Sequence, residues 1–498
     1  MASEYLKRID CGEPLPFNNP HAVSVSLPAL SDVIGYEEGD PQIINKMRAG
    51  YPRFRMNNFL TESVILYRER KGTDDKYEVL PLSSFSAVKL LMDKFGEEFS
   101  TDHNGHFPLI KIEKTSAALP GVKSFLQNTG IIPSSRQAED FLIEEGKLKS
   151  PYEEEVESRE SALEIILETL SDAYSCNSGD IILANGGMNA VYSVFESIRG
   201  IQSKAGRTIF VQFGWMYLDT ISILKNFGTN YTNVSTVEEL EALLRARGNE
   251  VAALFLEIPN NPFVRTPDLP KISGLLKQYD VPLIVDGTVG TPYNVEVLTR
   301  SDIVIESLTK YACGNADLLM GAIVLNRKSE FSGSVAKSIS EMVEPPYIRE
   351  LQRLAFEIKG YRERMGKISA NTAGLADYLS GNPKIKKLYW ALGEDSSENY
   401  KKLMMGEGSV AGMISIVFDK PLQNYYDRLR IAQGPSLGTE FTLGMPYFYM
   451  AHYDLLKTTE GRKYLSGLGI DPELIRISVG TEPLEELIVV FEDLFKAD

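Results

Sequence analysis

Residues 281–311 have the sequence VPLIVDGTVGTPYNVEVLTRSDIVIESLTKY. Two short apolar runs in this stretch lead directly into polar residues, the first into Asp286 and the second into Ser307-Leu308-Thr309-Lys310. The apolar residues of each run are consecutive rather than alternating, which is typical of strands buried on both faces of a largely parallel sheet. The stretch therefore predicts two neighbouring strands of an α/β fold, at 281–286 and 302–306.

The same pattern continues on both sides of this stretch. Further runs rich in apolar and β-branched residues predict strands at 208–214, 251–258 and 321–326. Between them, 188–199 and 237–247 carry apolar residues three and four positions apart, as on one face of an amphipathic helix. Alternating strands and helices of this kind predict a mostly parallel sheet with helices on both faces.

The rest of the chain suggests three further parts. The first 60 residues are rich in Pro, Gly and Asn, which predicts an extended arm ordered by another surface such as a partner subunit. Residues 339–379 are strongly helical with a break at Pro345-Pro346, and 412–418, 474–479 and 482–496 predict two strands and a terminal helix. We therefore expect an N-terminal arm (1–60), an inserted subdomain (61–175), a large domain (176–338) and a smaller C-terminal α/β domain (339–498).

Composition excludes several classes of protein. The 498 residues include 52 Lys and Arg against 68 Asp and Glu, and the net charge of -16 disfavours nucleic acid and anionic membranes as partners. No run of about 18 apolar residues could span a membrane. The N-terminus lacks the apolar run of a secretory signal, and three cysteines are too few for a disulfide framework, so we expect a cytoplasmic protein. His103 and His106 lack a third ligand, so no metal site is predicted.

A glycine turn and a strand end are the first candidate ligand contacts. Gly187-Met188 leads into the predicted helix at 188–199, where backbone N–H groups can bind a phosphate. Asp286 ends a predicted strand, where side chains point into the ligand crevice of open α/β sheets. A carboxylate there can pair with the protonated nitrogen of a pyridine that acts as an electron sink. The plain alternatives are a helix start without a ligand and an aspartate that caps a loop.

Further candidates follow other strand ends. Lys310 would lie in an apolar crevice, where a lowered pKa favours the neutral amine that forms a Schiff base. Ser307 and Thr309 would face the phosphate. Asn261 is placed to hydrogen-bond cofactor and substrate, and Tyr217 to stack on a pyridine ring. Singly these residues are explained as a surface lysine, an Asn-Pro turn and a core tyrosine, but together they predict contacts to one phosphorylated pyridine aldehyde.

With these motifs in this order, the sequence resembles the fold-type I pyridoxal-phosphate enzymes of cysteine and methionine metabolism. The resemblance implies pyridoxal 5'-phosphate as cofactor and catalytic roles for Lys310, Tyr217 and Asp286. Further matches imply other contacts. Arg476 would clamp the substrate carboxylate, Ser436 would orient the lysine and substrate, and Tyr51 and Arg53 would reach the phosphate of a neighbouring subunit's cofactor.

Within this family, the opening segments 20–28, 35–40 and 50–54 and the inserted motif at 128–139 resemble the fungal type of cystathionine gamma-synthase. The resemblance therefore spans almost the whole chain. Two departures concern substrate identity. Gly287 replaces the common Asn after the aspartate, and Gly314-Asn315-Ala316-Asp317 lacks the common His-Ser.

The resemblance implies γ-replacement on an O-acyl-L-homoserine, with L-cysteine as nucleophile and cystathionine as product, within transsulfuration and methionine biosynthesis. Alternatives are a cystathionine lyase, a γ-substituting enzyme of secondary metabolism that uses another nucleophile, and a non-catalytic relative that binds pyridoxal phosphate. The expected partners are small amino-acid substrates. The neighbour-borne arm implies a homodimer or homotetramer.

Overall fold

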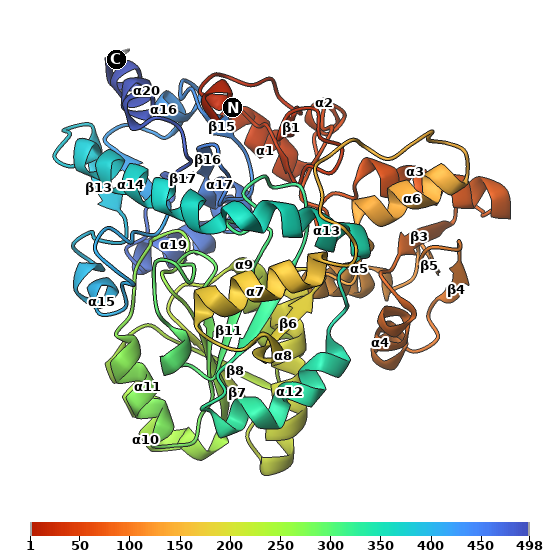
Figure 1. The fold of residues 1–498 in the computed structure, drawn as a ribbon, viewed down its shortest axis with the longest axis horizontal. Coiled ribbons are helices and arrows are strands. Elements are labelled where there is room, and N and C mark those ends of the chain that lie inside the picture. The colour runs from red at the N-terminus through yellow and green to blue at the C-terminus, as the bar shows by residue number, and fades with distance from the viewer. Residues whose placement is uncertain (1, 497–498) are drawn as a thin grey trace.

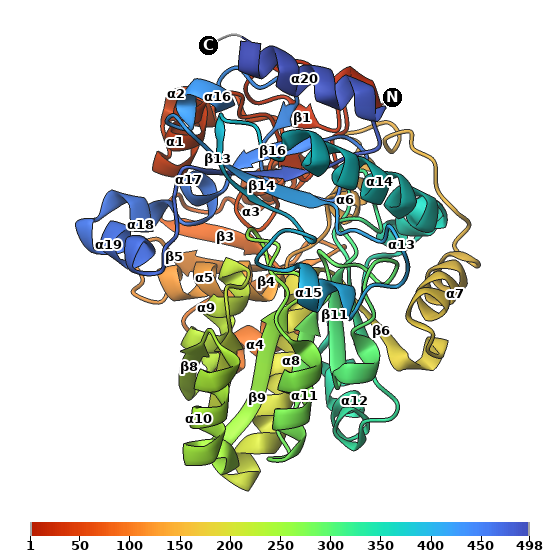
Figure 2. The same ribbon diagram turned by 90° about the vertical axis from the view of Figure 1, so that its left-hand side faces the viewer.

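The computed structural model describes residues 2–496 and contains four β-sheets, with two, three, five and seven strands. Figure 1 shows the seven-stranded sheet in the lower half of the molecule and the C-terminal elements above it. In Figure 2 the five-stranded sheet lies between the large sheet and the helices α14 (Tyr361–Leu379) and α20 (Leu484–Lys496). The cavity described below lies between these two sheets.

The seven-stranded sheet is largely parallel, as predicted. Only one of its strands, β12, runs against the others, because β12 pairs antiparallel with both neighbours. Every residue of β9 is buried, which explains its consecutive apolar sequence. In spatial order the strands are β6 (Ile181–Ala184), β12 (Gly321–Leu325), β11 (Ile303–Ser307), β10 (Leu283–Asp286), β9 (Val251–Glu257), β7 (Ile209–Phe213) and β8 (Asn230–Val234).

Helices cover both faces of this sheet, as the sequence predicted. Two separate apolar clusters, one on each face, fix the two helix layers. One layer contains α7 (Ala162–Tyr174), α10 (Val237–Arg247), α11 (Leu269–Lys277) and α13 (Ile348–Glu357). The other contains α5 (Leu119–Thr129), α8 (Gly187–Gln202), α9 (Leu218–Phe227) and α12 (Glu330–Met342).

The C-terminal sheet confirms both strands predicted for this part of the chain. Its order is β13 (Ile385–Tyr389), β14 (Met413–Phe418), β17 (Leu474–Ser478), β16 (Leu443–Pro446) and β15 (Ala432–Gln433). The predicted helical stretch 339–379 is divided, since α12, α13 and α14 are separate helices. Short helices complete this part: α15 (Ser397–Lys401), α16 (Gln423–Tyr426), α17 (Tyr447–Ala451), α18 (Tyr453–Lys457) and α19 (Thr459–Gly467).

The N-terminal segment packs on the five-stranded sheet of its own chain. Val25 and Leu27 belong to the same apolar cluster as Ile414 and Ile477 of the five-stranded sheet. Backbone bonds add to this contact, because the N–H of Leu27 donates to Gln433 O at 2.8 Å. The elements of this segment are β1 (Pro14–Leu15), β2 (Ser24–Val25), α1 (Leu30–Glu38) and α2 (Pro41–Ile44).

A separate three-stranded antiparallel sheet follows, at the right of Figure 1. It consists of β3 (Tyr77–Pro81), β5 (Pro108–Glu113) and β4 (Ser100–His103), with α3 (Asn58–Lys71), α4 (Phe85–Phe95) and α6 (Ser135–Glu144) around it. The division into arm, inserted subdomain and two larger domains stays a prediction. One helix, α12, crosses the boundary expected at 338.

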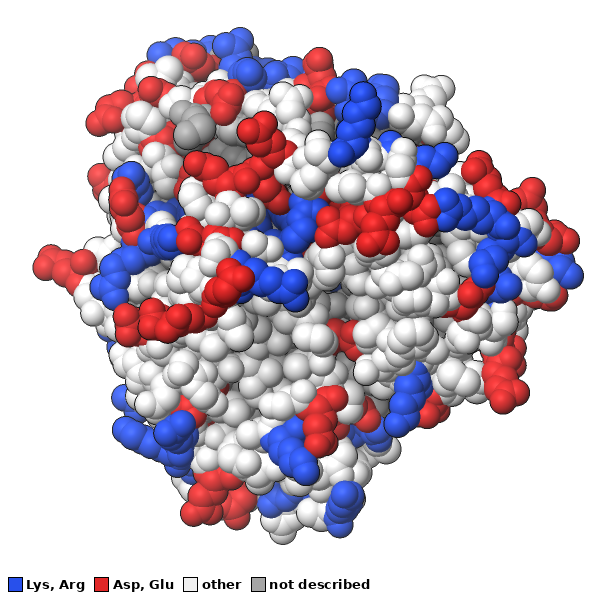
Figure 3. Space-filling model, turned by 45° about the vertical axis from the view of Figure 1, so that its right-hand side comes forward, with Lys and Arg blue, Asp and Glu red and all other residues white. Residues whose placement is uncertain are grey.

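Among residues 2–496, no helix combines the length and apolar character needed to cross a bilayer. Figure 3 shows acidic and basic side chains interspersed around the edge of one face, with a broad uncharged area across its middle. The charge on this face forms no continuous basic stripe of the kind that tracks a nucleic-acid backbone.

Candidate active site

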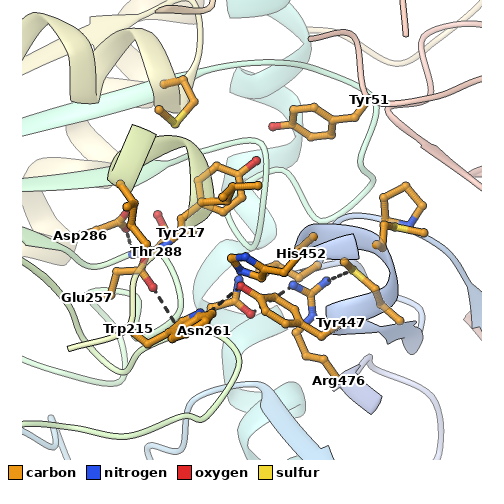
Figure 4. A pocket seen from close by; sticks show the side chains of 18 of the residues that line it. Tyr51, Trp215, Tyr217, Glu257, Asn261, Asp286, Thr288, Tyr447, His452 and Arg476 are labelled. Carbon is orange, nitrogen blue, oxygen red and sulfur yellow. Dashed lines mark hydrogen bonds between the residues drawn. The ribbon is translucent and has the colours of Figure 1, made fainter. Parts of the chain in front are cut away.

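A cavity of about 970 Å³ lies between the C-terminal ends of the large sheet's parallel strands and the five-stranded sheet. It is lined by residues from both sheets and from the N-terminal segment. In Figure 4, Asp286, Glu257 and Tyr217 lie on one side of the cavity, Arg476 and Tyr447 on another, and Tyr51 on the wall opposite them. The predicted site residues that line it are Tyr51, Arg53, Gly187, Met188, Tyr217, Asn261, Asp286, Ser307, Lys310, Ser436 and Arg476.

Lys310 lies in the turn after β11 and is half-buried at the cavity wall. Its Nζ donates to Ser436 Oγ at 3.0 Å and lies 4.6 Å from the centre of the Tyr51 ring. Desolvation lowers the pKa of Lys310. The Tyr51 hydroxyl opposes this shift, the guanidinium groups of Arg476 and Arg53 add to it, and the net effect is a lowered pKa. The amine forms no ion pair with any described residue. A neutral, nucleophilic amine is therefore favoured at this position.

Asp286 ends β10, and its Oδ1 accepts the Thr288 N–H at 2.9 Å. Burial raises the pKa of this carboxyl group. No cation among the described residues pairs with it. A carboxylate held at a strand end without a counter-ion is a site for a cationic group of a ligand.

Glu257 is a site residue that the sequence analysis missed. It lies beside Asp286, since the two residues are paired in the register of β9 and β10. One carboxylate oxygen accepts the Tyr217 N–H and the other accepts the Asn261 N–H at 3.1 Å. Burial and the neighbouring Asp286 raise the pKa of Glu257 to about 8. One side chain thus fixes the two loops that carry Tyr217 and Asn261.

We expect Glu257→Gln to weaken cofactor binding. An amide has a single acceptor oxygen, so one of the two backbone N–H groups loses its partner. A buried donor left unsatisfied costs about 1–3 kcal/mol. Cofactor titration of the apoprotein, followed by quenching of protein fluorescence, measures the change. Glu250→Gln, just before the other end of the same strand, is the control, and equal affinity in both variants would contradict the role of Glu257.

The N-terminus of α8 has the backbone geometry that suits an anion. Its first residue follows Gly186, which offers no side-chain cap, so the backbone N–H groups of the first turn are available to a ligand. A Cβ on Gly187 would lie 2.9 Å from the Cβ of Ser307, so glycine is required for this close approach. The Ser307 hydroxyl lies beside the same turn. These groups suit a phosphate.

Tyr51 and Arg53 line the cavity of their own chain. The contact with a neighbouring subunit's cofactor that the resemblance implied stays a prediction. Arg53 pairs with Asp219 at 2.5 Å, donates to Tyr217 Oη at 2.8 Å, and donates to Gln127 O at 2.7 Å. The N-terminal segment packs on its own five-stranded sheet, which brings both residues to this position.

Arg476, on β17, is 3% exposed. Its guanidinium donates to Asn261 Oδ1 at 3.2 Å and to the Ser436 carbonyl oxygen, and it lies over the Tyr447 ring. It pairs with no carboxylate among the described residues, and its Nε has no partner there. A buried, unpaired guanidinium is suited to bind a carboxylate in a bidentate geometry.

Thr309 is the one predicted site residue that does not line the cavity. It is buried, and its Oγ1 accepts the Met320 N–H at 3.1 Å. The hydroxyl group thus braces the connection to β12 instead of facing the phosphate site. Further cavity residues not singled out from the sequence are Gln127, Trp215, Lys225, Tyr447 and His452.

No group of three or more His, Cys, Asp or Glu side chains in residues 2–496 is arranged to hold a metal ion. His103, on β4, accepts the Gly105 N–H, and His106 pairs with Glu144 at 2.8 Å. Both histidines lie in the inserted segment, and neither lines the cavity.

Residues 147–496 match the model of one protein family, described as Cys/Met metabolism PLP-dependent enzyme. The chain belongs to this family. Its members depend on pyridoxal phosphate and bind small amino-acid substrates, so this protein is a pyridoxal-phosphate enzyme.

Two relatives match almost the whole chain. An L-2-amino-4-chloropent-4-enoate dechlorinase/desaturase from Streptantibioticus cattleyicolor is 35% identical over 490 residues, covering 97% of this chain and 98% of the relative. Cystathionine gamma-synthase of Neurospora crassa is 27% identical over 617 aligned positions, covering 98% of both chains. The similarity to a fungal cystathionine gamma-synthase is thus confirmed, but a relative with a different reaction is more similar.

The solved structures show the fold. Cystathionine gamma synthase from Xanthomonas oryzae pv. oryzae matches with a TM-score of 0.57 and 20% identity, over 67% of this chain and 85% of that chain. The predicted fold-type I architecture is therefore confirmed for this pyridoxal-phosphate enzyme.

The residues of the cavity fit pyridoxal phosphate. The uncapped N-terminus of α8 suits the phosphate, the unpaired Asp286 suits the pyridinium nitrogen, and the unpaired Lys310 suits the aldehyde. Each is a polar group without a charge partner among residues 2–496, and each matches one functional group of the cofactor. The specific role of each residue remains our proposal.

Proposed function

We propose that this enzyme displaces a substituent from Cγ of an L-amino acid, most simply the acyl group of an O-acyl-L-homoserine in exchange for L-cysteine. The Cγ–O bond breaks and its electron pair leaves on the acid, a Cγ–S bond forms, the thiol loses its proton, and cystathionine results. The observation that carries the proposal is the position of Lys310, an unpaired amine held by Ser436 in the cavity that Asp286 and the unpaired Arg476 also line.

Different residues of the cavity bind the substrate and transfer its protons. Bound pyridoxal phosphate supplies an electron-withdrawing ring conjugated to Cα of the amino acid. Arg476 binds the α-carboxylate, and its contact with Asn261 fixes the orientation of both side chains. Lys310, with its lowered pKa, takes the proton from Cα while Ser436 holds Nζ in place.

Tyr51 is a second group that can exchange a proton near Lys310. Burial alone would raise the pKa of Tyr51, but the charges of Lys310 and Arg53 more than offset burial and lower it. Its ring lies 4.6 Å from Lys310 Nζ. We assign to this hydroxyl the proton exchange with Lys310 that precedes departure of the γ-substituent.

Product analysis tests this function. Purified holoenzyme should consume O-acetyl-, O-succinyl- or O-phospho-L-homoserine in the presence of L-cysteine and form cystathionine, identified by mass spectrometry. Without a thiol, the same substrate should release 2-oxobutanoate. Absence of both products with all three esters would overturn the proposal, and turnover of cystathionine itself would favour a lyase.

A second candidate function rests on the 35% identical relative, whose name gives a substrate with chlorine on C4, the γ carbon. Elimination of chloride from Cγ needs the same base and the same carboxylate clamp. Release of chloride from L-2-amino-4-chloropent-4-enoate, measured against the homoserine esters, decides between the two substrates. A non-catalytic role is disfavoured because Lys310 and Arg476 both line the cavity.

We also propose a cytoplasmic location, a place in transsulfuration and methionine biosynthesis, and a homodimeric or homotetrameric state. The resemblance to enzymes of that metabolism supports the pathway. Light scattering coupled to size-exclusion chromatography measures the assembly, and a monomeric mass would refute it.

A further inference from the structure

Two loops from distant parts of the chain meet at the amine of Lys310. The turn 308–314, which we call the lysine turn, follows β11 and carries Lys310. The loop 434–442, which we call the serine loop, connects β15 to β16 and carries Ser436. Because Lys310 Nζ donates to Ser436 Oγ at 3.0 Å, and neither residue lies in a helix or strand, the position of the amine depends on how the two loops are held together.

The serine loop is held from outside itself. Ser436 has a φ of 86°, a conformation that residues with a side chain rarely adopt and that persists only when the surroundings fix it. Two backbone N–H groups of the loop anchor it. The Gly438 N–H donates to Ser478 Oγ on β17, and the Glu440 N–H donates to Gly314 O of the lysine turn, both at 2.7 Å. The second of these bonds joins the two loops directly.

One buried side chain also bonds to both loops. Arg364, near the start of α14, is 4% exposed. Its Nη1 donates to the carbonyl oxygens of Tyr311 at 3.0 Å and Ala312 at 3.2 Å, the two residues that directly follow the lysine. Its Nε donates to Glu440 Oε1 of the serine loop at 2.9 Å. The guanidinium group therefore bridges the lysine turn and the serine loop.

The orientation of this guanidinium group is fixed. Its Nη2 donates to the carbonyl oxygen of Glu357, the last residue of α13, at 3.1 Å. Gly314, the first residue of the motif 314–317, has a φ of +77°, and a Cβ there would overlap Arg364 Nε. Arginine presents its donors in a rigid planar fork, which the compact ammonium group of lysine cannot reproduce. An arginine is thus specifically suited to this position.

We propose that Arg364 is a positioning residue for Lys310, because it holds the lysine turn against the serine loop and so keeps Nζ at Ser436. Arg364 is not among the described residues that line the cavity, so it acts through Lys310 rather than on a substrate. The inference rests on the role proposed for Lys310 and adds the residue that maintains it. Lys310→Ala tests that role by itself, so the two can fail separately.

Formation of the covalent link distinguishes positioning from general structural support. Apoenzyme is mixed with pyridoxal phosphate in a stopped-flow instrument, where fluorescence quenching reports cofactor binding and visible absorption reports its link to the amine. We expect Arg364→Lys to slow the absorbance phase about tenfold, since small displacements of a reacting group have effects of this size, and to leave the quenching phase unchanged. An unchanged absorbance phase, or equal slowing of both phases, would overturn the proposal. Arg362→Lys is the control, because Arg362 contacts the Tyr293 ring instead.

A double variant tests whether Arg364 acts through the contact between Lys310 and Ser436. Holoenzyme in D₂O should exchange the Cα proton of L-norvaline, which has no γ leaving group, and NMR measures the rate. Ser436→Ala removes the contact. If Arg364 serves that contact, adding Arg364→Lys to Ser436→Ala slows the exchange no further. Effects of the two substitutions that multiply would instead show that Arg364 acts independently, and would refute the inference.

Glu440→Ala breaks one end of the bridge at a side chain that is 44% exposed, so the fold should tolerate it. We expect it to slow the absorbance phase about threefold, the size of one hydrogen bond, with unchanged quenching. This variant carries the test if Arg364→Lys does not fold. An absorbance phase at the wild-type rate in Glu440→Ala would then count against the bridge.

Discussion

Replacing Lys310 by alanine is expected to make the visible absorption of the holoenzyme removable by dialysis and to lower kcat by about 10⁴-fold. The substitution removes the amine proposed both to bind the cofactor covalently and to act as the base in the cavity that Asp286 and Arg476 line. Asp286 and the N-terminus of α8 remain, so cofactor should still bind, but dialysis should remove it. Absorption spectra before and after dialysis, together with product assays, measure both effects.

The matched control for this variant is Lys271→Ala, an exposed lysine on α11 that pairs with Glu238. It should retain colour and activity. Addition of methylamine to the Lys310→Ala enzyme should restore part of the proton transfer, since a free amine can enter the space of the side chain. A Lys310→Ala enzyme that keeps a dialysis-resistant visible band would refute the assignment.

Replacing Arg53 by alanine is expected to inactivate the enzyme in a way that no other subunit can repair. The substitution leaves Asp219 buried without its partner, which costs about 3–5 kcal/mol. Because Arg53 contacts Tyr217 of the same chain, the defect lies in the same site as the lysine of that chain. Mixtures of Arg53→Ala and Lys310→Ala, denatured and refolded together, should therefore show no activity above the separate variants.

Recovery of activity in the mixture would contradict this prediction. If the arm crossed between two subunits of a dimer, random reassembly would give hybrids with one intact site, and the mixture would regain about a quarter of wild-type activity. Arg48→Ala, an exposed arginine of the same segment that pairs with Glu13, controls for general damage to the arm.

Much of the fold followed from the sequence because buried parallel strands carry a strong pattern. The runs at 251–258 and 281–286 are apolar at consecutive positions, and both are strands. Two strands of the seven-stranded sheet were missed. Strand β8 has the sequence Asn-Tyr-Thr-Asn-Val and lies at the sheet edge, so its side chains are partly exposed and lack the apolar pattern. Strand β6 has four residues and precedes a glycine turn, which gives too short a run to recognise.

The candidate site was predictable where the side chain itself contacts the cavity. Glu257 was missed because a carboxylate that accepts backbone N–H groups of two loops leaves no pattern in the sequence. His452 and Trp215 were missed for a related reason, since aromatic side chains in a long chain usually belong to the core. Which cavity Tyr51 and Arg53 line depends on the surface against which their segment packs. The sequence pattern does not show that surface, because it is a feature of the tertiary structure.

The packing of the N-terminal segment also determines when the enzyme can mature. During synthesis the segment leaves the ribosome first, but the β17 residues beneath Val25 and Leu27 are among the last to be made. Arg53 and Arg476, far apart in the sequence, therefore meet only after β17 has been translated. Loading of the vitamin B6 cofactor into a finished pocket is consequently a post-translational event, and a nascent chain stalled before residue 474 should fail to retain it.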